Sequence, residues 1–128
     1  MILLLDTSTP ICKVTLVDGD KKYNTEWEAN RELAKHLLSY LRDQLESHDK
    51  TWQDIEAIAA FKGPGSFTGL RIGLTVLNTI ADSEQISIVG ETGEDWQEKA
   101  LARLENGEND RIVLPFYGSE AHITKPRK

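Results

Sequence analysis

The chain has 128 residues, a formal net charge of −6 at pH 7 and a single cysteine. This length predicts one domain with one core, and the acidic balance excludes autonomous nucleic-acid binding through a basic surface. Cys12 lies in an apolar, β-branched run, so we expect a buried residue in a reducing cytoplasm without disulfides. No apolar run approaches the roughly 18 residues of a membrane span, and we expect no membrane contact.

The first thirty residues predict three strands. Residues 2–5 are a continuous apolar run that is too short and too poor in basic residues for a signal peptide, and is typical of a buried strand. Residues 13–17 form a second predicted strand, and Asp18-Gly19 favours a hairpin turn. Residues 22–27 then return as a third, antiparallel strand.

A long amphipathic helix is predicted next, over residues 31–48, with Asn30 as its N-cap. Its apolar side chains recur at intervals of three and four on one face: Leu33, Ala34, Leu37, Leu38, Leu41 and Leu45. Thr51 and Asp54 have the spacing of a capping box, which predicts a short helical turn.

The chain then alternates between strands, at residues 55–61 and 86–89, and helices, at residues 70–81 and 92–104. Three hairpin-joined strands followed by this alternation predict a mixed five-stranded sheet with helices on its faces. That is the ribonuclease H-like arrangement, which is also one lobe of the actin-like ATPase fold.

The C-terminal part carries weaker signals. Asn106-Gly107 is predicted to end the last helix. Residues 105–110 are expected to be the least ordered segment inside the chain. Residues 112–114 are predicted to form a last short strand. Residues 124–128 are basic and are expected to be mobile.

We therefore expect residues 1–105 to form the lobe, and residues 106–128 to form a C-terminal strand and a mobile tail.

The most informative segment is a glycine-rich turn that passes directly into the second helix. We expect a structural turn made of Gly63, Pro64, Gly65, Ser66, Phe67, Thr68 and Gly69. The turn could present backbone N–H groups to a phosphate, or it could let two backbones pack closely. The spacing matches neither a Walker A loop nor a G-x-G-x-x-G fingerprint, which favours close packing. Thr68 is the expected N-cap, and Gly65 is expected to need a positive φ.

The helix after this turn has an unusually wide apolar arc of roughly 200°, about twice what one sheet requires. We assign Ile72, Val76 and Ile80 to the sheet. The first helix could cover part of the surplus, and a protein partner is the natural candidate for the rest. The predicted interface consists of Leu70, Arg71, Gly73, Leu74 and Leu77, together with Leu37 and Leu41 of the first helix. Arg71 is expected either to pair with an acidic group of the partner or to face solvent.

Two segments resemble the TsaB (YeaZ) family. The start, Ile2-Leu3-Leu4-Leu5-Asp6-Thr7-Ser8-Thr9, is similar to the start of family members. The turn and the beginning of the helix, from Gly63 to Gly73, match the family over consecutive positions. Leu114-Pro115-Phe116-Tyr117 resembles a Pro-x-Tyr segment near the end of many members.

This resemblance implies an actin-like fold without a working active site. The family supplies a non-catalytic, cytoplasmic assembly subunit of the bacterial complex that installs threonylcarbamoyl on adenosine in tRNA. The implied partner is a TsaD-like threonylcarbamoyltransferase, associated with a TsaE-like ATPase. The chain is expected to dimerise when alone and to meet tRNA only through the complex. Family members carry a second lobe, so the resemblance implies a short form that lacks most of it.

The residues leave a minimal actin-fold ATP-binding protein, acting as a dimer of single lobes, as the alternative function. A tRNA-contacting module that uses the basic tail is disfavoured as a stand-alone activity by the acidic balance. In the ATP-binding alternative, Asp6 would be a magnesium-linked carboxylate; otherwise it is a strand-end residue that hydrogen-bonds the next turn. His36 is followed four residues later by Tyr40, a poor replacement in a metal site, and His48 and His122 stand apart. We therefore expect no catalytic residue, no cofactor and no metal.

Overall fold

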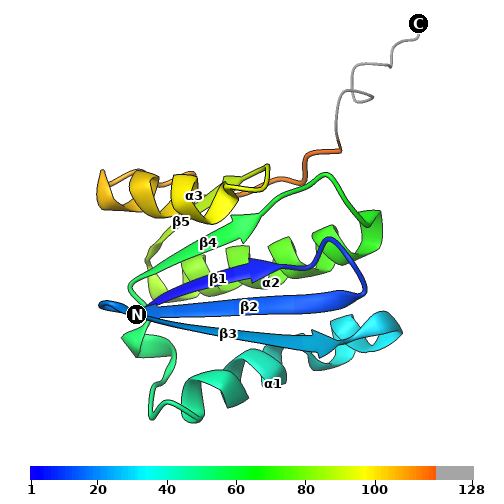
Figure 1. Ribbon diagram of the computed structural model, residues 1–128, viewed down its shortest axis with the longest axis horizontal. Coiled ribbons are helices and arrows are strands. Elements are labelled where there is room, and N and C mark those ends of the chain that lie inside the picture. Colours follow the sequence, from blue (N-terminus) through cyan, green and yellow to red (C-terminus); the bar gives the residue numbers. More distant parts are fainter. Residues whose placement is uncertain (118–128) are drawn as a thin grey trace, which may run out of the picture.

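A computed structural model describes residues 1–117 and contains one five-stranded sheet in the order β3-β2-β1-β4-β5 (Figure 1). The strands are β1 (Ile2–Asp6), β2 (Ile11–Asp18), β3 (Lys21–Glu28), β4 (Ala57–Phe61) and β5 (Ser87–Glu91). The helices are α1 (Leu33–Glu46), α2 (Phe67–Glu84) and α3 (Trp96–Glu105), with short 3-10 turns η1 (Asn30–Glu32) and η2 (Trp52–Asp54). The predicted ribonuclease H-like arrangement is confirmed.

The sheet is mixed because the chain changes from hairpins to crossovers after β3. The first three strands pair antiparallel, whereas β1 pairs parallel with β4 and β4 pairs parallel with β5. The hairpin turn is Gly19-Asp20 rather than Asp18-Gly19, since β2 extends through Asp18. Gly19 has a φ of +63°, a conformation that glycine adopts at no steric cost.

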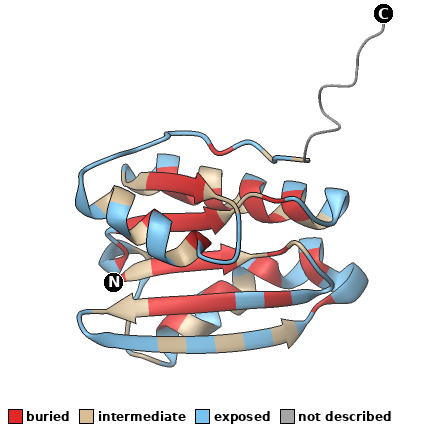
Figure 2. Cartoon of the chain, turned by 45° about the horizontal axis from the view of Figure 1, so that its top comes forward, coloured by how far each residue is buried: buried red, intermediate tan, exposed pale blue. Residues whose placement is uncertain are grey.

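Apolar side chains cover both faces of the sheet. On one face, α1 contributes Leu33, Leu37, Leu41 and Leu45, and α2 packs beside it in the same cluster. On the other face, Trp96 and Ala100 of α3 pack against the central strands. Figure 2 shows these central strands as buried, while the edge strand β3 alternates between exposed and intermediate residues.

Several boundaries differ from the predicted ones for local reasons. Asn30 does not cap α1: it lies in η1 with a φ of +48°, and α1 begins at Leu33 without a side-chain cap. The last helix begins at Trp96, after Gly93 with a φ of +92°. Thr51 and Asp54 form the predicted capping box. Cys12 is 1 % exposed, and burial, followed by the nearby charge of Asp6, raises the pKa of its thiol to about 12.

The segment after α3 is the main departure. Residues 112–114 are not a strand, because side chains rather than a backbone ladder hold this segment against its neighbours. Residues 105–110, predicted as the least ordered, carry Glu108 and Asp110, which pair with Arg103. The predicted mobile tail, residues 124–128, lies outside the described residues.

Candidate protein-binding surface and the glycine-rich turn

Three glycines at intervals of four place the start of α2 directly on the turn that follows β1. A Cβ at Gly65 would lie 2.4 Å from Cβ of Ser8, and one at Gly69 would lie 2.3 Å from the carbonyl oxygen of Thr7. A Cβ at Gly73 would lie 2.2 Å from Oγ1 of Thr7. Gly65 does not have the positive φ that we expected. The glycines are therefore explained by close approach of two backbones.

The backbone N–H groups of Ser66, Gly69 and Leu70, at the start of α2, are engaged within the chain. Ser66, not Thr68, is the N-cap: its Oγ accepts a hydrogen bond from the Gly69 N–H at 3.1 Å. The Ser66 N–H donates to the carbonyl of Ser8 at 2.8 Å, and the Leu70 N–H donates to the carbonyl of Ser66 at 2.9 Å. Phe67, Thr68 and Gly69 of the predicted turn already belong to the helix. This arrangement agrees with close packing rather than with a phosphate cradle.

Asp6 makes the hydrogen bonds expected of a strand-end residue. Its Oδ1 accepts from the Ser8 N–H at 2.8 Å and from the Ser8 hydroxyl at 2.6 Å. The buried Thr7 hydroxyl donates to the carbonyl of Gly69 at 2.7 Å, which joins the turn to α2. Asp6 and its neighbours thus fix the position of α2 on the sheet.

The histidines of the described region lie apart. His36 is 3.4 Å from Glu32 on the exposed side of α1, and the ring of His48 lies 4.2 Å from that of Tyr23. Within residues 1–117, no group of three histidine, cysteine, aspartate or glutamate side chains is placed to hold a metal ion. His122 lies outside the described residues.

Six of the seven predicted interface residues are buried inside the chain. They are Leu37, Leu41, Leu70, Gly73, Leu74 and Leu77. The rotation of α2 explains the error: the side that bears Gly69 and Gly73 must face Thr7, so the leucines beside it enter the core. The interface as predicted is therefore corrected. Arg71 is exposed, and its guanidinium lies 5.0 Å from the centre of the Phe67 ring.

The outward side of α1 and α2 carries apolar residues other than those of the predicted interface. Ile72 and Val76, assigned to the sheet from the sequence, are only half-buried and pack at the margin of the core. They lie on the side of α2 away from Asn78, which bonds the C-terminal segment, and thus toward α1. Leu38 of α1 is 54 % exposed. We define the α1–α2 surface as Ala34, Leu38, Ile72, Thr75, Val76 and Thr79.

A cleft of about 770 Å³ opens at the N-terminal end of this surface. It lies between the turn after β1, the start of α1 and the start of α2. Its apolar lining includes Pro10, Ala29, Leu33 and Ile72. The α1–α2 surface and this cleft form one continuous feature, because Ile72 belongs to both.

Comparison with known proteins agrees with this architecture. A family model described as TsaD, tRNA N6-adenosine threonylcarbamoyltransferase, matches residues 27–92, just over half of the chain. TsaB of Escherichia coli is 36 % identical over 70 % of this chain and 38 % of its own length. TsaB of Haemophilus influenzae is 29 % identical over 97 % of this chain and 52 % of its own length. The solved structure of YeaZ from Pseudomonas aeruginosa superposes with a TM-score of 0.69 at 31 % identity, covering 83 % of this chain and 49 % of that one.

The sheet order, the parallel crossovers and the glycine-bearing helix on the first turn define a lobe of the actin-like, ribonuclease H-like fold. Within that class, the chain belongs to the TsaB (YeaZ) family. It spans between about a third and a half of the length of these curated relatives. Across residues 1–117, the helices are too short or too polar to cross a membrane.

Proposed function

We propose that this chain is a non-catalytic subunit in the biosynthesis of threonylcarbamoyladenosine in tRNA, and that it binds a TsaD-like threonylcarbamoyltransferase. The names of its relatives support the pathway. The observation that carries the binding role is Leu38 of α1, a leucine more than half exposed, together with the half-buried Ile72 and Val76 of α2. An apolar group of this kind, on two helices anchored in the core, is suited to a protein partner.

The turn after β1 supports a non-catalytic role. Asp6 is engaged by Ser8, and the amides of Ser66, Gly69 and Leu70 donate within the chain. These groups give α2 its position, which the binding surface requires. We propose that catalysis belongs to the TsaD-like subunit, that a TsaE-like ATPase joins the assembly, and that tRNA is met only through the complex in the cytoplasm.

Binding to the TsaD-like protein of the same genome is the direct test. We expect the two purified proteins to form a complex whose mass equals the sum of one or two copies of each. Leu38→Glu should weaken this complex at least about tenfold in calorimetry, because a charge would be buried at the contact. Ile112→Glu is the matched control, since Ile112 is 64 % exposed on a different surface. Equal affinity for both variants would contradict the α1–α2 surface as the binding site.

The alternative function, ATP binding by a dimer of single lobes, needs a separate measurement. We expect no heat of binding when magnesium ATP is titrated into the chain alone. Binding would support the alternative, and magnesium-dependent ATP hydrolysis that is lost in Asp6→Ala would refute the non-catalytic role. A loss of threonylcarbamoyladenosine from tRNA in cells that carry Leu38→Glu, measured by mass spectrometry of nucleosides, would place the surface in the pathway.

A further inference from the structure

The strand β5 lies at the edge of the sheet. Within residues 1–117, β5 pairs with β4 and with no other strand. In a parallel strand, alternate residues direct both backbone groups to the same side. Ile88 and Gly90 direct theirs away from β4, because their N–H groups donate to Asn109 and Asp110. Val89 lies between them in the ladder with β4. An edge with such groups free is a template for an added strand.

Two consecutive side chains occupy the positions where a sixth strand would bond. The Ile88 N–H donates to Oδ1 of Asn109 at 3.0 Å, and the Gly90 N–H donates to Oδ2 of Asp110 at 2.9 Å. The Asp110 N–H donates to the carbonyl of Ile88 at 2.8 Å. The edge is thus satisfied mainly by side chains, and without a backbone ladder that another strand could extend.

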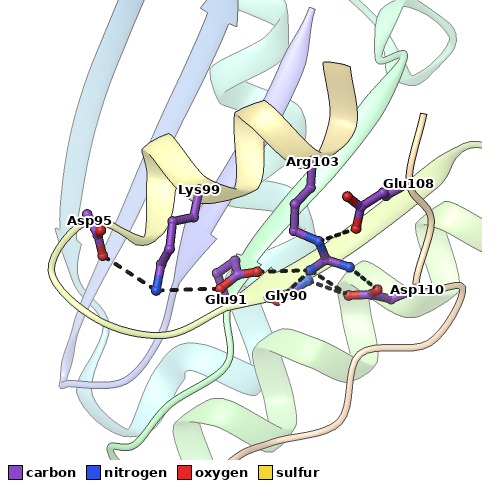
Figure 3. Close-up of polar contacts among 7 residues, drawn as sticks. All are labelled: Gly90, Glu91, Asp95, Lys99, Arg103, Glu108 and Asp110. Carbon is purple, nitrogen blue, oxygen red and sulfur yellow. Dashed lines mark hydrogen bonds and ion pairs between the residues drawn. The ribbon is translucent and has the colours of Figure 1, made fainter. Parts of the chain in front are cut away.

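Arg103 of α3 fixes this arrangement (Figure 3). Its Nη1 donates to the carbonyl of Gly90 at 3.1 Å, to Oε2 of Glu91 at 3.1 Å and to Oδ2 of Asp110 at 3.2 Å. Its Nη2 donates to Oδ1 of Asp110, and its Nε donates to Oε1 of Glu108 at 2.7 Å. One guanidinium therefore joins α3, β5 and the following segment, with the charge-assisted bonds that are strongest among side chains.

The next residues complete the cover. Val113 is 3 % exposed and lies against Gly90, where a Cβ would be 2.4 Å from its Cγ1. Asn78 of α2 bonds both backbone groups of Val113, accepting from its N–H at 2.9 Å and donating to its carbonyl at 3.0 Å. The segment is held at both ends, from α3 and from α2.

We propose that Asn109 and Asp110, of which Asp110 is locked by Arg103, form an edge cap that prevents another chain from adding a strand to β5. The occupant that the cap excludes is the β5 edge of a second copy. Two identical edges related by a two-fold axis run antiparallel, and each offers the same two outward N–H groups and the same two outward carbonyls. The cap restricts self-association to surfaces other than the sheet edge.

Amide hydrogen exchange and sedimentation of the full chain test the cap. In Asp110→Ala, we expect the Ile88 and Gly90 amides to exchange about tenfold faster or more, while the Val89 amide keeps its rate. We also expect an assembly larger than that of the wild type at the same concentration. Asp110→Asn keeps an acceptor for Gly90 but loses the charge that Arg103 binds, so its effect should be intermediate.

Lys99→Ala is the matched control. Lys99 also lies on α3 and pairs with Glu91 at 3.6 Å and with Asp95 at 3.5 Å, and not with the cap. This variant should leave exchange and assembly unchanged. If Asp110→Ala speeds exchange at every amide, the whole fold has been weakened. Asn109→Ala is then the test, and the exchange rate of the Ile88 amide is the measurement, because this N–H donates to Asn109. Unchanged exchange at Ile88 in that variant, or faster exchange without a larger assembly, would overturn the proposal.

Discussion

At the scale of single residues, the glycine-rich segment is a packing device. Gly65, Gly69 and Gly73 share one side of the chain that rests on Thr7 and Ser8, and each leaves no room for a Cβ. A side chain at any of these three positions would collide with the backbone of the turn after β1 or with the buried Thr7 hydroxyl, and not with the mobile end of a long side chain. These positions therefore set both the distance and the rotation of α2 on the sheet.

Gly73→Ala tests this interpretation. We expect the free energy of unfolding to fall by about 1–3 kcal/mol, because the added methyl group would overpack against Thr7. Thr75→Ala is the control, since Thr75 is exposed on the same helix and alanine is a better helix former. Urea denaturation followed by circular dichroism measures both variants. Equal midpoints for Gly73→Ala and the wild type would show that Thr7 can move aside.

The sequence and the structure differ on which hydroxyl group caps the N-terminus of α2. Ser66 accepts the Gly69 N–H, whereas Thr68 is exposed within the first turn of the helix. We expect Ser66→Ala to destabilise the fold by about 1 kcal/mol, the usual value of an N-cap, and Thr68→Ala to change stability much less. Thermal unfolding of the two variants side by side distinguishes the caps. A larger loss of stability in Thr68→Ala than in Ser66→Ala would show that Thr68 is the N-cap, as predicted from the sequence.

At the scale of elements, the segment after α3 is held by charge. Burial of Asp110 opposes ionisation, but the hydrogen bonds from Arg103 and Gly90 outweigh it and hold the pKa of Asp110 below its usual range. A carboxyl group with a lowered pKa in the folded state stabilises the fold above its unfolded pKa of about 4. That contribution is lost as the pH falls through the lower, folded value.

We therefore expect Asp110→Asn to be less stable than the wild type at pH 7, and the difference to shrink as the pH falls below about 4. Chemical denaturation at a series of pH values between about 7 and 2.5 measures the difference. Arg103 keeps its charge throughout, because the hydrogen bonds that it donates to Asp110 and Glu108 raise its pKa further. A difference that is independent of pH would show that the charge of Asp110 does not contribute.

At the scale of the whole molecule, the two faces of the sheet have different roles. The face under α3 is closed by Trp96 and by the Arg103 network, whereas the face under α1 and α2 leaves apolar side chains at its outer margin. A second copy of the chain can cover that margin, by a two-fold axis that brings like surfaces together.

We expect the purified chain to sediment as a homodimer at tens of micromolar, a range typical of such modest apolar contacts. Leu38→Glu should give a folded monomer, since Leu38 is largely exposed and its loss leaves the core intact. Ile112→Glu should remain dimeric. A wild-type monomer, or a dimer that is broken only by Ile112→Glu, would place self-association elsewhere.

Much of this architecture could be predicted from the sequence. The continuous apolar run of β1, the hairpin of β2 and β3, and the leucines of α1 at helical spacing determine the sheet and its layers through local patterns. The consecutive match in the glycine-rich turn determines the family. These features depend on residues that are neighbours in the chain, so they can be recognised without knowledge of distant contacts.

Only the tertiary structure decided which side of α2 faces outward and how the sheet ends. The rotation of α2 depends on Thr7, some sixty residues earlier in the chain, because Gly73 must fit against it. The end of the sheet depends on Asn109 and Asp110, whose side chains take the place of a strand, and Arg103 holds Asp110. A helical wheel reports how wide an apolar arc is, but not where its contacts lie, since those are set by residues far away in sequence.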